Sequence, residues 1–334
     1  TVPLIRGMSV CSNTRATASM CDRMNIAFGF DNNYVPHVAA TVASIVATAR
    51  NISSIRFILL HTGVPEDRRT QLEAVAPAAR FEWIEVHASD IPAITGRESI
   101  SHINQTTFLR LATERCAPSD CDRLIYLDAD LTVKSDLRDL WDYDLGDHYL
   151  GAVHDCVDAP EFASRWGLPP NKLGYFNAGV LLIDLVKVRA ERAFSQALNF
   201  ILENNPPLAD QDALNWVAWG RWTRIPTRWN VQRHIAIGYR LDERLEAEAI
   251  TGDSAAIVHF TGTQKPWVRD AYHPWAWLYW AALQRTPFLA EVEKKSGIRA
   301  SGRLRLRLRW SRMRARALVH RSKCAARYMR DNPM

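Results

Sequence analysis

Two aspartates separated by one residue, Asp128 and Asp130, follow the apolar run 124–127. Carboxylates at positions i and i+2 of a turning backbone can converge on one hard divalent cation, which prefers oxygen ligands and can bridge them to a phosphate. A loop acid can instead cap the helix that follows, and Ser135 and Asp136 have the composition of such a cap. The D-x-D pattern alone therefore leaves a metal site and a structural role both open.

The same stretch, DADLT, also matches the D-x-D-x-T pattern of haloacid-dehalogenase-type phosphatases, in which the first aspartate attacks phosphate. That family begins its domain with this strand and later supplies a lysine and an acidic pair. Here residues 25–123 already have α/β character, and the later pair Gly252 and Asp253 has no acid four residues on. These two differences disfavour the phosphatase.

Apolar runs of strand length alternate with helical periodicities along the body of the chain. The predicted strands are 26–30, 55–60, 81–86, 124–127, 149–153 and 180–183, and the predicted helices are 38–49, 66–75, 107–116 and 185 to about 202, before a break at Pro206 and Pro207. This alternation is typical of an α/β fold with a mostly parallel central sheet and helices on both faces. Without repeats or an internal linker, we expect one domain over 25–290, a loose extension over 1–24 and a basic tail over 291–334.

Sheets of this kind bind ligands where the carboxyl ends of their strands meet loops. The segments FDNNY at 30–34 and DAD at 128–130 both come directly after predicted strands, so we expect them at the same edge of the sheet. No G-x-G-x-x-G follows the first strand, and a dinucleotide-binding fold therefore lacks its fingerprint.

Several widely spaced motifs together resemble the family-8 retaining glycosyltransferases, in particular the bacterial lipopolysaccharide galactosyl- and glucosyltransferases. The resemblance runs from Asn25 to Trp267 and implies a GT-A-type nucleotide-diphospho-sugar transferase fold. Its landmarks, in chain order, are FDNNY at 30–34, HINQTTFLRL at 102–111, LIYLDADLTV at 124–133, YFNAGVLLIDL at 175–185, DQDALN at 210–215 and HFTGTQKPW at 259–267.

The resemblance implies a metal site built from Asp128, Asp130 and His259. An imidazole nitrogen beside two carboxylates suits Mn²⁺ better than Mg²⁺, and the ion would neutralise the diphosphate leaving group. A lone histidine at a strand end is often structural. The residues after it favour the site, because Lys265 can reach a phosphate and Gly262 lets the backbone approach closely.

The family pattern also implies a set of donor contacts. The nucleotide would meet the segment after the first strand, with the Tyr34 ring against uracil, although an ordinary turn explains an Asn-Asn pair equally well. The expected donor-binding residues are Asp31, Asn33, Tyr34, Arg110, Asp155, Asn177, Gly262 and Lys265.

In this family, the residue at the position of Gln211 lies beside the reacting carbon, and Asp210 binds the sugar. Retention of configuration requires either a covalent intermediate or a front-face route, and an amide oxygen is a poor nucleophile. We therefore expect a front-face transfer, with covalent catalysis by Asp210 left open.

Composition and charge limit the class of protein. With 47% hydrophobic and 23% charged residues, the chain is globular. Twelve Lys and Arg in 299–334 face one acid, Asp331, so this segment carries a net +11; since the whole chain carries +6, the remainder sums to −5. Six cysteines without framework spacing, and the lack of any long apolar run, predict a cytoplasmic protein.

The tail contains RLRLRLRW from Arg303, whose alternation by itself indicates a strand. Read as a helix, the tail carries cations on both sides of an apolar stripe, such as Arg305 and Arg307, an arrangement typical of helices that lie flat on a membrane. A solvated arm and a nucleic-acid-binding segment are the alternatives, and the latter leaves the donor site unexplained. The stripe consists of Leu306, Trp310, Met313, Ala317, Cys324 and Tyr328.

Together these observations predict a retaining, manganese-dependent hexosyltransferase. It would move galactose or glucose from a UDP-sugar to a saccharide or glycolipid of the cell envelope, such as a lipopolysaccharide core. Residues 303–330 would attach it to the anionic inner face of the plasma membrane, and no nucleic acid is expected as a partner. The alternatives are a metal-dependent phosphatase and a non-catalytic, basic-tailed binding module.

Overall fold

A computed structural model describes residues 23–87, 108–232 and 255–311, except for 270, 272, 274, 300, 306, 309 and 310. Residues 1–22 of the predicted N-terminal extension, most of HINQTTFLRL and the tail beyond 311 lie outside the described residues.

The centre of the protein is a seven-stranded sheet. Its strand order is β3 (Arg80–Glu85), β2 (Ile55–His61), β1 (Met24–Phe30), β4 (Arg123–Leu127), β7 (Phe176–Asp184), β6 (Leu150–His154) and β8 (Thr223–Arg224). Among these described strands, only β7 is antiparallel to its neighbours. The predicted mostly parallel sheet is confirmed, and each predicted strand lies within a few residues of its observed position.

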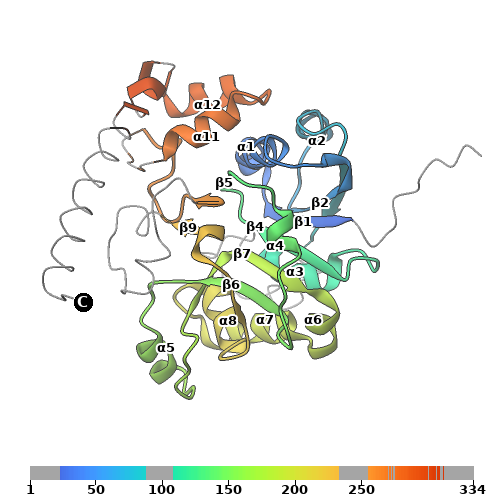
Figure 1. Cartoon of the computed structure of the whole chain (residues 1–334), viewed down its shortest axis with the longest axis vertical. Coiled ribbons are helices and arrows are strands. Elements are labelled where there is room, and N and C mark those ends of the chain that lie inside the picture. The colour runs from blue at the N-terminus through green and yellow to red at the C-terminus, as the bar shows by residue number, and fades with distance from the viewer. Residues whose placement is uncertain are drawn as a thin grey trace, which may run out of the picture.

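Helices cover both faces of the sheet (Figure 1). On one face lie α1 (Val35–Val46) and α2 (Glu66–Glu73); on the other lie α3 (Leu109–Cys116), α6 (Leu185–Glu191), α7 (Ala193–Asn204) and α8 (Ala209–Val217). Because alternate strand residues point to opposite faces, the buried side chains form two separate cores, and the central strands read as unbroken apolar runs.

The prediction of one helix from 185 to about 202 is wrong. The chain forms α6 and α7, which meet at Arg192 in the left-handed region with φ 53°. A residue at that φ interrupts the helical hydrogen-bond ladder, and residue-type periodicity does not reveal it. The expected break at Pro206 and Pro207 is confirmed, since α7 ends at Asn204 and α8 starts at Ala209.

A second sheet of three short strands lies beside the first. It consists of β5 (Leu131–Val133), β10 (Ile257–His259) and β9 (Val231–Gln232), with β10 between the other two. Next to it, α11 (Ala276–Leu283) packs on α1, and α12 (Leu289–Ser296) follows. The other short elements of the described chain are α4 (Arg138–Trp141), α5 (Ala159–Arg165) and 3-10 turns at Asn32–Tyr34, Ile52–Ser54 and Thr227–Trp229.

Within the basic tail, the chain leaves the helical conformation at 297–299 after α12 and is helical again at 301–305, 307, 308 and 311. Arg303 pairs with Glu293, and its guanidinium lies 5.7 Å from the centre of the Trp280 ring. Leu304 and Leu308 are exposed. Among the described residues, no helix is long and apolar enough to cross a membrane.

Candidate active site

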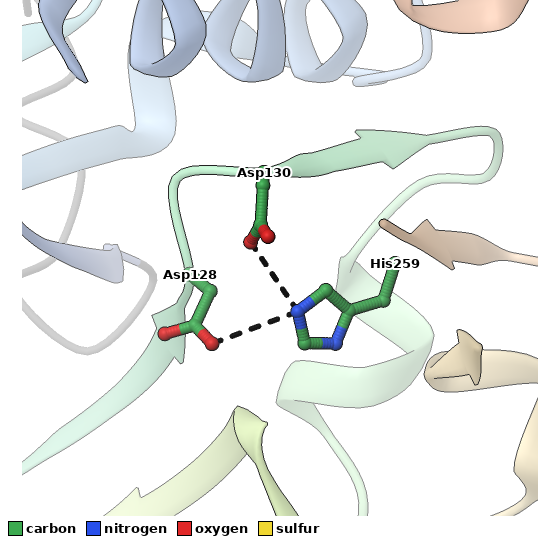
Figure 2. Close-up of side chains that lie close together, drawn as sticks. All are labelled: Asp128, Asp130 and His259. Atoms are coloured by element: carbon green, nitrogen blue, oxygen red, sulfur yellow. Dashed lines mark ion pairs between the residues drawn. The ribbon is translucent and has the colours of Figure 1, made fainter. Parts of the chain in front are cut away.

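The two aspartates lie in the loop between β4 and β5, at the carboxyl edge of the main sheet. Pairing of β5 with β10 sets His259 opposite Leu131, and Phe260 N donates to the Asp130 carbonyl at 3.0 Å. His259 Nε2 lies 3.6 Å from Asp128 Oδ2 and 3.3 Å from Asp130 Oδ1 (Figure 2). The predicted convergence of these three side chains is therefore observed, with ligand atoms within 4.8 Å of one another.

The donor atoms of this cluster suit a divalent cation. Two carboxylates and one imidazole form a donor set that Mn²⁺ accepts. Gly179 in β7 lies directly against this cluster: a Cβ there would lie 2.1 Å from His259 Cε1 and 2.7 Å from Asp128 Oδ2. Any larger residue at position 179 would therefore clash with His259 and Asp128.

Lys265 lies against the Asp130 carboxylate. Its Nζ pairs with Asp130 Oδ2 and donates to the Phe260 carbonyl at 2.8 Å. Burial raises the pKa of Asp130, but Lys265 and His259 outweigh burial and hold that pKa well below its usual range. Gly262 lies three residues after the end of β10 and has φ 72°, so the turn that leads to Lys265 requires a residue tolerant of the left-handed region.

Arg110 on α3 connects the cluster of Asp128, Asp130 and His259 to Asp210. Its guanidinium donates to Asp128 Oδ1 at 2.7 Å and to the Ala178 carbonyl at 2.6 Å. Arg110 Nε lies 2.6 Å from Asp210 Oδ2, an ion pair without hydrogen-bond alignment. Burial lowers the pKa of Arg110, but Asp128 and Asp210 outweigh it and raise that pKa. These contacts hold Arg110 between two carboxylates, whereas its predicted contact with the donor stays a prediction.

Asp210 is a buried carboxylate at the start of α8, directly after Ala209, whose φ is 41°. Burial raises the pKa of Asp210 to about 6, and Arg110 opposes this effect. The protein therefore holds a carboxyl group whose ionisation is unfavourable in the folded state. Such groups are common where charge serves chemistry rather than stability.

We expect Asp210→Asn to stabilise the protein near neutral pH while it impairs activity. The raised pKa means that the folded protein retains a proton between about pH 4 and pH 6 that the unfolded chain releases, so stability falls as pH rises through that window. The variant should lack this fall and gain as much as about 3 kcal/mol at neutral pH. Urea unfolding at a series of pH values measures the effect, and parallel curves for the two proteins would contradict it.

A cluster of amides and one carboxylate lies beside Asp210. Gln211 Oε1 accepts from Asn177 Nδ2 at 3.0 Å and from Ala178 N at 3.1 Å. Asp155 Oδ2 accepts from Asn177 Nδ2 at 3.0 Å and from Gln211 Nε2 at 3.3 Å. The structure thus brings the predicted residues Gln211, Asn177 and Asp155 into direct contact.

Asn215 positions this cluster and was not singled out from the sequence. Its Oδ1 accepts from Phe176 N at 2.8 Å, and its Nδ2 donates to the carbonyls of Phe176 and Gln211, each at 2.9 Å. One side chain thereby ties α8 to β7. It stands in the motif DQDALN, whereas Gly179 stands in the strand YFNAGVLLIDL, where an interior glycine indicates close approach by another group.

The predicted nucleotide segment follows β1 at the same edge of the sheet. Asp31 Oδ1 accepts from Asn33 N at 2.9 Å and from Tyr34 N at 3.1 Å, so Asp31 closes the turn as the structural interpretation requires. The Tyr34 ring lies edge-on to Trp267, with centroids 6.3 Å apart. Burial raises the pKa of the Tyr34 hydroxyl and Lys265 opposes this rise, so the hydroxyl lies near the charges of Lys265, Asp130 and Asp128. Donor binding by Asp31, Asn33 and Tyr34 stays a prediction.

The fold and the site define a GT-A-type transferase. The galactosyltransferase LgtC, solved with donor and acceptor sugar analogs, matches with a TM-score of 0.71 and 28% sequence identity, covering 82% of this chain and all of that one. The model described as Glycosyl transferase family 8 matches residues 25–271. This chain belongs to glycosyl transferase family 8, which confirms the predicted fold and family.

Two further relatives each match three quarters or more of this chain. General stress protein A of Bacillus subtilis is 27% identical, over 75% of this chain and 90% of its own length. Lipopolysaccharide 1,2-glucosyltransferase of Escherichia coli K12 is 26% identical, over 82% of this chain and 81% of its own length.

Proposed function

We propose that this chain transfers galactose or glucose from a UDP-sugar, with Mn²⁺ and retention of configuration, to a cell-envelope glycan such as a lipopolysaccharide core. The observation that carries the proposal is the convergence of Asp128, Asp130 and His259 beside the Asp210 and Gln211 cluster. The named activities of LgtC and of the Escherichia coli relative support the substrate class.

When bound, the cation would supply positive charge for the diphosphate leaving group. Asp128, Asp130 and His259 would hold it. Lys265 stands next to this position and adds a second cation at the leaving group, since its ammonium already lies against Asp130. Mg²⁺ would serve less well, because it disfavours an imidazole ligand.

The hydrogen bonds of Gln211 support a front-face route. Both lone pairs of Gln211 Oε1 already accept hydrogen bonds, one from Asn177 and one from Ala178, so this oxygen is poorly disposed to attack carbon. Asp210 is held by Arg110 in an ion pair. In our proposal the acceptor hydroxyl attacks from the face that the diphosphate leaves, and the departing phosphate takes the proton.

The test is cleavage of UDP-galactose and UDP-glucose by the full chain with Mn²⁺, with Mg²⁺ and with chelator. Release of UDP that requires Mn²⁺ and favours one sugar supports the proposal and identifies the donor. Release of phosphate from simple monoesters without nucleotide preference would instead support the phosphatase. A protein that binds neither UDP nor Mn²⁺ would support the non-catalytic binding module.

We also propose that the protein works at the inner face of the plasma membrane, attached through residues 303–330. The described part of this segment is helical, and Leu304 and Leu308 are exposed. Arg307, predicted to flank the apolar stripe, also contacts the body of the protein, since its guanidinium lies 5.4 Å from the centre of the Trp277 ring. Basic residues further along the sequence would therefore provide most of the attraction to anionic lipids.

Truncation after residue 311 should release the protein from anionic vesicles while it keeps soluble-acceptor activity. This end point retains the contacts of Arg303 and Arg307 with the body, so the fold should be unaffected. Co-sedimentation with vesicles of phosphatidylglycerol, compared with neutral vesicles, measures the attachment. Unchanged sedimentation of the truncated chain would show that the tail is not the anchor.

A further inference from the structure

Asn230 is a fully buried side chain next to the proposed metal site, at the end of the 3-10 turn Thr227–Trp229. Its Oδ1 lies 2.9 Å from His259 Nδ1, and its Nδ2 donates to Asn177 Oδ1 at 2.8 Å. Both polar ends of its amide therefore contact residues of the site, although Asn230 itself is not one of the predicted ligands.

The direction of these hydrogen bonds is set by the backbone. Gly179 N donates to Asn177 Oδ1 at 3.0 Å, and a backbone N–H can only donate, so the Asn177 oxygen must face it. Asn230 must then present its NH₂ group to the same oxygen and its own oxygen to His259. Consequently His259 Nδ1 carries a proton, and Nε2 is the ring nitrogen that faces Asp128 and Asp130.

The same asparagine, Asn177, connects this arrangement to Gln211. Its Nδ2 donates to Gln211 Oε1, whose orientation is fixed in turn by the N–H of Ala178. A chain of oriented amides thus runs from His259 through Asn230 and Asn177 to Gln211, with its direction fixed by two backbone N–H groups.

We propose that Asn230 is a positioning residue for the divalent cation: it holds His259 in the tautomer that offers Nε2 to the metal and couples that ring to Gln211. The inference rests on the proposed metal-dependent function. Groups that orient a metal-binding histidine through its second nitrogen typically change metal affinity by about 10- to 100-fold when they are lost.

The first experiment reads the tautomer in the full chain without any activity assay. Long-range ¹H–¹⁵N spectra of ¹⁵N-histidine protein, recorded well above the ordinary imidazole pKa of about 6.5, distinguish the Nδ1–H from the Nε2–H form. Comparison with His259→Gln assigns the signal. We expect the Nδ1–H form in the wild type and in Asn230→Asp, which keeps an acceptor for that proton, and a mixture of forms in Asn230→Ala.

The second experiment measures Mn²⁺ affinity by calorimetry. Asn230→Ala should bind Mn²⁺ about 10- to 100-fold more weakly than the wild type. Asn25→Ala is the matched control, because Asn25 is also a buried asparagine with partners at both ends, Arg56 and the Arg123 carbonyl, on the amino side of β1. This control should keep its Mn²⁺ affinity.

An Nε2–H form in the wild type would overturn the proposal, as would an Asn230→Ala protein that keeps both the tautomer and the Mn²⁺ affinity. If Asn230→Ala does not fold, the wild-type and Asn230→Asp spectra still decide. A wild type that binds no Mn²⁺ contradicts the proposed function instead, while the metal-free spectra continue to test the role of Asn230.

Discussion

Asp130→Asn should reduce Mn²⁺-supported sugar transfer on the order of 1,000-fold, because the change removes a charged ligand and with it several kcal/mol of electrostatic stabilisation of the leaving group. The substitution keeps the size of the side chain but leaves Lys265 without the carboxylate that it contacts. Donor cleavage and Mn²⁺ calorimetry on the same preparation measure the two losses together.

Asp136→Asn is the matched control for this change. Asp136 belongs to the same acidic stretch, but its carboxylate accepts from Arg138 N at 2.7 Å and from Arg50 N at 2.6 Å, and so has a structural role. This variant should lose about 1 kcal/mol of stability at most and keep its metal affinity. Retained activity in Asp130→Asn, or equal losses in both variants, would refute the assignment of Asp130 as a ligand.

Gly179→Ala should weaken Mn²⁺ binding by on the order of 100-fold or more, although it adds only a methyl group. The new Cβ would lie 2.1 Å from His259 Cε1 and 2.7 Å from Asp128 Oδ2, so the ring and the carboxylate cannot both keep their places. Donor cleavage should fall in parallel. Calorimetry with Mn²⁺ and circular dichroism distinguish a displaced site from an unfolded protein.

Gly151→Ala separates the cost of packing from damage to the site. Gly151 lies on β6, which pairs with β7, and a Cβ there would meet Leu145 Cδ2 at 2.7 Å, the flexible end of a side chain. We expect a stability loss of about 1–3 kcal/mol with unchanged Mn²⁺ affinity in the folded protein. If Gly179→Ala also kept its affinity, the close approach at β7 would have no bearing on metal binding.

The elements of the fold were predictable where local periodicity is strong. Strands β1, β2 and β4 are apolar on both faces and helices α1 and α3 have clear periodicity, so their type and position could be assigned without tertiary information. The break at Arg192 was missed because a single residue in the left-handed region leaves no trace in the hydrophobic pattern. The second sheet was missed because its strands have only two or three residues.

The ligand types, the α/β class and the motifs of family 8 depend on residue identity and local spacing, so the amino-acid sequence alone was enough to deduce them. Which groups meet depends instead on the three-dimensional fold. The pairing of β5 with β10 brings His259 to the aspartates from more than a hundred residues away, Arg110 is held between Asp128 and Asp210, and Asn230 reaches His259. Such contacts follow from sheet register and from the closeness of backbones at Gly179, which the pattern of residue types along the chain does not encode.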